Sequence, residues 1–113
     1  MNRSELAKKI PVEVLSRAKP IFGDALHSVI LYGSYARGDY DDESDIDLML
    51  LLKMDRLEAK RFRKEMVHVA SELSLEHDVD VSTIMVPVNE FEKWKDDLPF
   101  YRNVATEGVS YVA

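Results

Sequence analysis

Hydrophobic side chains recur along this chain with two different periods, one typical of helices and the other of buried strands. The clearest helical stripe advances by four, three and four residues and consists of Phe62, Met66, Val69 and Leu73. Charged side chains fill most positions between them, as on the solvent face of an amphipathic helix. We therefore predict a helix from Asp55 to about Ser74, with Asp55 and Glu58 as a capping box at its start.

Three runs of apolar and β-branched residues predict strands, and these runs are Ser28–Tyr32, Asp45–Leu52 and Asp78–Val86. The first two runs are nearly free of polar side chains, which indicates strands that are buried on both faces. A fourth and shorter strand is predicted at Val109–Val112. Gly108, which precedes it, is expected to end the helix before that strand.

Shorter helices are expected around these strands. The segments are a short helix capped by Ser4, then Pro11–Lys19, Ser34–Gly38, a helix that begins at Asn89, and Phe100–Glu107. Pro20 is expected to end or kink the second of them, because proline cannot donate the backbone hydrogen bond of a helix interior. Helices that alternate with three or four strands predict a sheet covered by helices.

Composition narrows the classes of function. The chain has 113 residues, which is enough for one domain spanning residues 1–113 and too few for two. With 21 acidic and 15 basic residues the formal net charge is −6, so general binding to DNA or RNA is disfavoured. There is no cysteine, no signal-peptide core and no apolar run long enough to cross a membrane. We therefore expect a cytoplasmic protein without disulfides.

The candidate chemistry lies where the first strand ends and the second begins. A glycine–serine turn, Gly33-Ser34, follows the first strand, and Asp45 and Asp47 open the second. Residues two apart in a strand project from the same face about 6.5–7 Å apart, so two aspartates there can hold divalent metal ions. The N–H groups and the serine hydroxyl of the turn can bind phosphate. Together these residues predict nucleotide chemistry.

Each of these residues also has an ordinary structural alternative. Glycine after a strand often makes only a turn, and the acidic residues 39–43 fit a solvated loop better than a site. Asp45 and Asp47 lie inside an apolar run, where a carboxylate is costly unless it is paired or bound to a metal. The alternative is that they lie at the solvated start of the strand. Arg37 fits equally well as a ligand of nucleotide phosphate and as the partner of a nearby aspartate.

A third carboxylate is available on the next predicted strand. Asp78 and Asp80 flank Val79 and share one face, and one of them would complete a metal site with the first pair. Asp80 is the better candidate, because it lies deeper in the apolar run and its charge is harder to leave unpaired. The three histidines show no metal-ligand spacing and are expected to be ordinary surface or half-buried residues.

Aromatic side chains surround the candidate site. Packing explains Tyr32, whereas Tyr35 or Tyr40 is a candidate for stacking on a nucleotide base. The aromatic side chains of the C-terminal third are expected to pack its helices, and they are Phe91, Trp94, Phe100 and Tyr101.

The segment Gly33–Gly38 (GSYARG) with Ser44–Leu48 (SDIDL) resembles the two-part motif of the DNA polymerase beta-like nucleotidyltransferase superfamily. The similarity is greatest to the minimal, single-domain branch of that superfamily, the MNT proteins. It extends in element order to about Val86, and the segment Asp97–Val109 is similar to the end of such proteins.

The resemblance implies an α/β (α+β) fold class, with a mixed three- to four-stranded sheet flanked by helices, the nucleotidyltransferase core. It also implies transfer of a nucleoside monophosphate from a nucleoside triphosphate, with ATP as the expected substrate and two Mg²⁺ ions as cofactors. By position in the motif, the triphosphate would be held by Gly33 and Ser34, with Arg37 as a further candidate. The catalytic and metal-binding carboxylates would be Asp45, Asp47 and Asp80.

MNT proteins are often paired with a HEPN-domain ribonuclease toxin, which they neutralise by binding it or by attaching AMP to one of its tyrosines. The resemblance therefore implies an antitoxin that adenylylates a HEPN partner. Two alternatives stay open. One is a binding module that neutralises a partner by contact alone, and the other is a transferase for small molecules of the aminoglycoside type. The sequence does not decide whether the chain forms a homo-oligomer.

Overall fold

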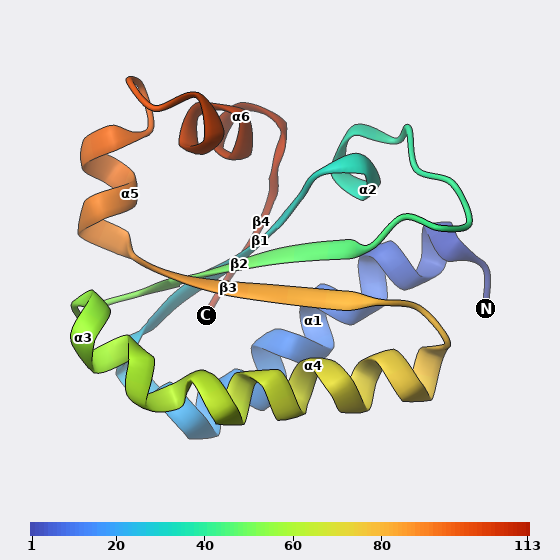
Figure 1. The fold of residues 1–113 in the computed structure, drawn as a ribbon, viewed down its shortest axis with the longest axis horizontal. Coiled ribbons are helices and arrows are strands. Elements are labelled where there is room, and N and C mark those ends of the chain that lie inside the picture. The colour runs from blue at the N-terminus through green and yellow to red at the C-terminus, as the bar shows by residue number, and fades with distance from the viewer.

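A computed structural model describes residues 1–113 and contains one four-stranded sheet with the strand order β3-β2-β1-β4. The strands are β1 (Leu26–Tyr32), β2 (Ile46–Leu52), β3 (Val81–Pro87) and β4 (Val109–Val112). Strand β1 pairs antiparallel with β2 and β4, and β2 pairs in parallel with β3, so the sheet is mixed. The predicted fold class, a mixed sheet flanked by helices, is confirmed (Figure 1).

Helices cover both faces of this sheet. In chain order the helical segments are α1 (Arg3–Phe22), η1 (Gly23–Ala25), α2 (Ser34–Arg37), α3 (Arg56–Ala59), η2 (Lys60–Phe62), α4 (Arg63–His77), α5 (Val88–Trp94) and α6 (Pro99–Glu107). Figure 1 shows α1 and α4 on one face and α5 and α6 on the other. None of these helices is both long enough and apolar enough to cross a lipid bilayer.

The two faces of β2 contribute to two separate cores, because successive side chains of a strand point to opposite faces. The larger cluster has 21 buried residues, lies against α1 and α4, and takes from β2 the side chains of Ile46, Leu48, Leu50 and Leu52. The smaller cluster has seven buried residues, lies against α5 and α6, and takes from β2 only Met49 and Leu51. The start of β2 is therefore less covered on the α5/α6 face than on the opposite face.

The predicted strands are confirmed to within about two residues, except at the start of β3. Asp78 adopts a left-handed conformation with φ 51° and ends α4, and its N–H bonds the carbonyl of Ser74. Strand β3 therefore begins at Val81 and not at Asp78. The predicted N-cap at Asp55 is confirmed, because its carboxylate accepts a 2.8 Å hydrogen bond from the N–H of Glu58. In place of one helix to about Ser74, however, the segment consists of α3, η2 and α4, and α4 runs to His77.

The prediction for the N-terminal segment was wrong. In place of two short helices, a single helix α1 runs from Arg3 to Phe22 with Pro11 and Pro20 inside it. Its N-cap is Asn2, not Ser4. A continuous stripe of buried side chains on α1 packs against β1 and α4. This burial outweighs the backbone hydrogen bonds that the two prolines cannot donate.

Replacing a core side chain of β2 should test this packing. Leu50 is fully buried, and Leu50→Ala should lower the free energy of unfolding by about 2–5 kcal/mol, because it leaves a cavity in the larger core. Leu57, which is 77% exposed, is the matched control, and Leu57→Ala should change the free energy of unfolding by less than about 0.5 kcal/mol. Urea unfolding measures both values, and equal losses in the two variants would contradict the packing described.

Candidate active site

The glycine–serine turn and the Asp47 carboxylate are in direct contact. Tyr32 lies opposite Asp47 in the antiparallel register of β1 and β2, and Gly33 follows directly beyond that pair. Gly33 has φ 76° and ψ −155°, a region of backbone conformation essentially restricted to glycine. A Cβ atom on Gly33 would lie 2.6 Å from Oδ2 of Asp47. Glycine is therefore required both for the backbone conformation and for the close approach of the carboxylate.

Asp47 lies on the face of β2 that points away from the larger core, and Asp45 directly precedes the strand. Ile46 and Leu48, which alternate with them, are fully buried against α1 and α4. Asp45 is exposed and Asp47 is half-buried. The arrangement lies between the two alternatives that the sequence left open. The pair is at the open start of the strand, and Asp47 nevertheless reaches into partial burial against the turn.

The surroundings of Asp47 disfavour its negative charge. Partial burial raises the pKa of the Asp47 carboxyl above its ordinary value, and the neighbouring Asp45 raises it further, whereas the Arg37 guanidinium lowers it. A cation bound between the two aspartates would relieve this repulsion. The available donors are oxygens, which hard cations such as Mg²⁺ prefer. The residues present therefore fit a magnesium site.

Asp80 lies beside the start of β2. The N–H of Ile46 donates a 2.8 Å hydrogen bond to the Asp80 carbonyl, and Ile46 pairs with Val81 in the parallel register. Asp80 directly precedes β3, whose first residue, Val81, belongs to the larger core, and it lines a pocket that Arg3 and Asp78 also line. Asp78 caps α4 before the strand begins. Of the two predicted candidates, Asp80 is the one in line with β3.

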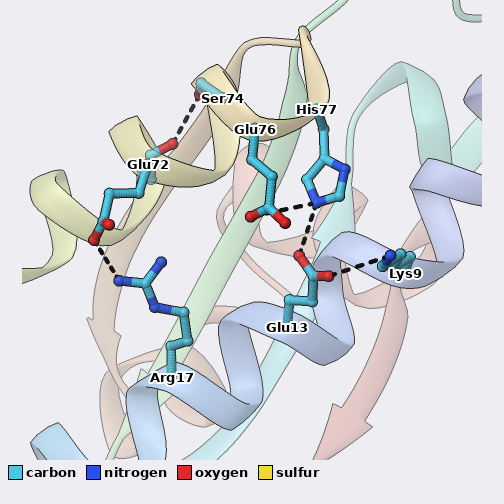
Figure 2. A network of polar contacts seen from close by, with 8 residues as sticks. Lys9, Glu13, Arg17, Glu72, Ser74, Glu76 and His77 are labelled. Atoms are coloured by element: carbon cyan, nitrogen blue, oxygen red, sulfur yellow. Dashed lines mark hydrogen bonds and ion pairs between the residues drawn. The ribbon is translucent and has the colours of Figure 1, made fainter.

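The closest group of metal-ligating side chains lies elsewhere, between α1 and α4 (Figure 2). Only Glu13, Glu76 and His77 bring three ligand atoms within 4.8 Å of one another, so the three aspartates are less tightly gathered. His77 Nε2 lies 2.9 Å from Glu13 Oε2, and Lys9 pairs with Glu13 at 3.7 Å. These contacts make the group a polar clamp between two helices, which the spacing of the histidines did not indicate.

Arg37 is held by two carboxylates. Its Nε donates to Asp39 at 3.2 Å and its Nη1 donates to Glu107 at 3.4 Å. The sequence left phosphate binding and pairing with an aspartate equally open, and the structure contains the pairing. Since its charge lowers the pKa of Asp47, the guanidinium also remains close enough to act on the site.

Tyr35 and Tyr40 stack on each other, with ring centroids 4.3 Å apart and an interplanar angle of 7°. Tyr35 is buried, and its hydroxyl accepts a 3.1 Å hydrogen bond from Nη1 of Arg3. The pair thus fastens α2 to the loop that follows it and to the start of α1. The stack covers one face of each ring, and the burial of Tyr35 leaves it unavailable to a base, whereas stacking of Tyr40 on a base stays a prediction.

The predicted packing of the C-terminal aromatic side chains holds for Phe91 and Tyr101, which are buried, and fails for Trp94 and Phe100, which are 39% and 48% exposed. Phe100 lies against Tyr32 with ring centroids 5.6 Å apart and an interplanar angle of 83°. Burial, assisted by the charge of Asp47, raises the pKa of Tyr32 to about 12, so Tyr32 stays neutral. The rings of Phe100 and Tyr32 therefore lie near Asp47, and the sequence did not predict this contact.

A mixed sheet that presents paired aspartates against a glycine–serine turn is suited to enzymes that act on nucleoside triphosphates. The profile of the nucleotidyltransferase domain matches residues 11–111 of this chain. The chain therefore belongs to the nucleotidyltransferase domain family. The family and the core that the motif predicted are confirmed.

Relatives with similar sequences come from Methanocaldococcus jannaschii. "Putative protein adenylyltransferase MJ0141" is 43% identical over 65 residues, which cover 58% of this chain and 64% of the relative. "Putative protein adenylyltransferase MJ0604" is 32% identical over 96 residues, which cover 85% of this chain and 88% of the relative. The chain thus spans slightly less than two thirds of the first relative and most of the second.

Two crystal structures have a similar fold. One is the toxin–antitoxin MntA-HpeT in a mutant form, with a TM-score of 0.54 and 17% identity over 91% of this chain and 73% of that chain. The other is a toxin–antitoxin with AMP-PNP, with a TM-score of 0.54, 18% identity and the same coverage. At these identities the similarity establishes the fold alone.

The contact between Gly33 and Asp47 can be tested with alanine. Gly33→Ala should lower the free energy of unfolding by about 2–4 kcal/mol, because it adds a strained backbone and a Cβ that displaces Oδ2 of Asp47. Gly38 also has positive φ but no heavy atom near its Cβ position, so Gly38→Ala should lose only about 1–2 kcal/mol. Chemical denaturation measures both, and equal losses would show that the carboxylate contact is unimportant.

Removing the charge of Asp47 should stabilise the ligand-free protein. A carboxyl group whose pKa is raised in the folded state destabilises that state as the pH rises above its ordinary value of 3.8. At pH 7, Asp47→Asn should therefore raise the melting temperature by up to about 5 °C, and the gain should disappear near pH 4. Glu43→Gln, an equal charge change in the exposed loop, should have no such effect. A lower melting temperature for Asp47→Asn in calorimetry at pH 7 would show that the Asp47 charge does not destabilise the ligand-free protein.

Proposed function

We propose that this chain is a Mg²⁺-dependent nucleotidyltransferase that transfers AMP from ATP to a hydroxyl group of a partner protein. The observation that carries the proposal is the contact of the Asp47 carboxylate with the Gly33 backbone, with Asp45 two residues earlier, directly before β2. It brings a metal-binding pair and a phosphate-binding turn together at one point of the sheet. The names of the two relatives, both protein adenylyltransferases, support AMP as the group transferred.

Each residue of the site has a defined task in this proposal. Gly33 and Ser34 hold the triphosphate through backbone N–H groups and the serine hydroxyl. The metal ligands are Asp45, Asp47 and Asp80. Bound there, Mg²⁺ supplies charge stabilisation for the oxygens on which negative charge develops.

The transfer exchanges one phosphorus–oxygen bond for another. The acceptor hydroxyl oxygen bonds to the α-phosphorus of ATP, and the bond from that phosphorus to the oxygen bridging to the β-phosphate breaks. Pyrophosphate leaves with the electron pair of the broken bond. A carboxylate oxygen of Asp80 takes the proton of the attacking hydroxyl as the new bond forms. The products are an AMP ester of the acceptor, pyrophosphate and a proton.

The acceptor that we propose is a tyrosine of a HEPN-domain toxin, which makes this chain an antitoxin. The fold neighbours are toxin–antitoxin structures, and one of them contains AMP-PNP. The net charge of −6 also suits a basic protein partner, such as one that binds RNA, better than it suits RNA itself.

Transfer of label from ATP is the direct test. The chain is incubated with α-labelled ATP, Mg²⁺ and the product of the neighbouring gene, and label on that protein is measured after denaturing electrophoresis. We expect label that resists denaturation, that requires Mg²⁺, and that falls by at least about 100-fold in Asp45→Asn, because two metals cannot be held without the pair.

The controls separate catalysis from binding. Glu43→Gln removes an equal charge from the neighbouring exposed loop and should label the partner as the wild type does. Capture of the partner by immobilised Asp45→Asn protein should persist, because the substitution removes a metal ligand and not an interface. Partner neutralisation that survives in Asp45→Asn without any label would favour a binding module in place of the enzyme.

A further inference from the structure

Phe100 is an aromatic side chain that the fold holds at the surface. It is 48% exposed, whereas the next residue, Tyr101, is 8% exposed and packs in the smaller core. Large apolar side chains are more often buried than left half in water. The exposed ring lies in the first turn of α6, where Pro99 occupies the first helical position. The exposed part of the Phe100 ring therefore does not contribute to the packing of α6 on the sheet.

The position of the ring relates it to the aspartates. Phe100 meets Tyr32 edge to face at 5.6 Å between ring centroids, and Tyr32 is the cross-strand partner of Asp47. Paired residues of antiparallel strands point to the same face of the sheet. Figure 1 shows α6 on the face of the sheet away from α1 and α4, which is the face that carries Asp47. Tyr32 thus contacts the ring of Phe100 and pairs with Asp47 across the two strands.

The ring is also held in place from behind. Phe100 contacts Tyr101 with ring centroids 5.8 Å apart. The Tyr101 hydroxyl donates a hydrogen bond to the Glu90 carboxylate. Arg56 donates two further hydrogen bonds to the same carboxylate, one of them 2.7 Å long. These contacts tie α6 to α5 and α3. A ring that is fixed before a ligand arrives loses little conformational entropy when the ligand binds.

We propose that the exposed face of Phe100 stacks on the base of the nucleoside triphosphate whose phosphates lie at Gly33 and Ser34. This inference rests on the proposed function and adds the residue that binds the base. A surface with a net charge of −6 offers a polyanionic nucleotide little general attraction, so contact with the uncharged base adds affinity beyond that of the phosphates. Stacking accepts any base but gains from a larger ring, so purine nucleotides should bind more tightly than pyrimidine nucleotides.

Binding of a nucleotide and of its phosphates alone separates the base contact from the rest of the site. Isothermal calorimetry is run with Mg²⁺ and the ATP analogue that carries a methylene group between the α- and β-phosphates. The same titration is repeated with inorganic tripolyphosphate. Phe100→Ala should weaken the analogue about tenfold and leave tripolyphosphate unchanged within twofold, because only the analogue has a base to stack.

Further variants distinguish stacking from simple packing. Phe100→Leu keeps an apolar side chain without an aromatic face and should lose as much affinity as Phe100→Ala, whereas Phe100→Trp should keep or increase it. Leu98→Ala is the matched control, since Leu98 is 44% exposed on the same segment, and it should bind both ligands as the wild type does. Trp94, 39% exposed on α5, gives a second control of this kind as Trp94→Ala.

The outcomes discriminate between this inference and the function on which it rests. If the wild type binds both ligands and Phe100→Ala does too, with unchanged affinity, the inference is overturned and the proposed function stands. The same holds if Phe100→Ala instead weakens only capture of the HEPN-domain partner, since the ring would then serve a protein interface. Equal losses for the analogue and tripolyphosphate also overturn it. A wild type that binds neither ligand overturns the proposed function as well.

Discussion

The approach of the Asp47 carboxylate to the backbone of Gly33 is the contact on which the site depends. It exists because β1 and β2 pair in a register that sets Tyr32 opposite Asp47, one residue before the turn. A slip of one residue would turn Asp47 toward the larger core and Leu48 toward the site, since strand side chains alternate with period two. The buried side chains of β2 therefore set the geometry of the catalytic candidates as well as the stability of the sheet.

Stability and chemistry are divided between the two faces of the sheet. The face against α1 and α4 buries 21 residues in one cluster, and its side chains lock the register. The opposite face has a cluster of seven, and there the start of β2 is free to present charged groups. The half-buried Asp47, with its raised pKa, is tolerated because the other face supplies enough burial. Local destabilisation of this kind is typical of functional sites.

Much of this arrangement can be predicted from the sequence, and the limit lies at contacts set by tertiary packing. The spacing of Asp45 and Asp47 is enough to predict that both side chains point to the same side, because the alternation of side chains along a strand depends only on local sequence. The exposure of Phe100 and its contact with Tyr32 depend on how α6 docks on the sheet, which no local pattern encodes. The prediction for α1 was wrong because burial of the helix against β1 overrides the tendency of Pro11 and Pro20 to interrupt a helix.

The position of a metal ion in a crystal of the protein with a bound nucleotide analogue tests most directly whether the aspartate pair holds the metal. The crystals are grown with the methylene-bridged ATP analogue and with Mn²⁺ in place of Mg²⁺, because Mn²⁺ scatters anomalously. We predict an anomalous peak between Asp45 and Asp47, with the triphosphate of the analogue on the Gly33–Ser34 turn. An empty aspartate pair, or manganese only at the Glu13–Glu76–His77 clamp, would show that the aspartates do not form the metal site.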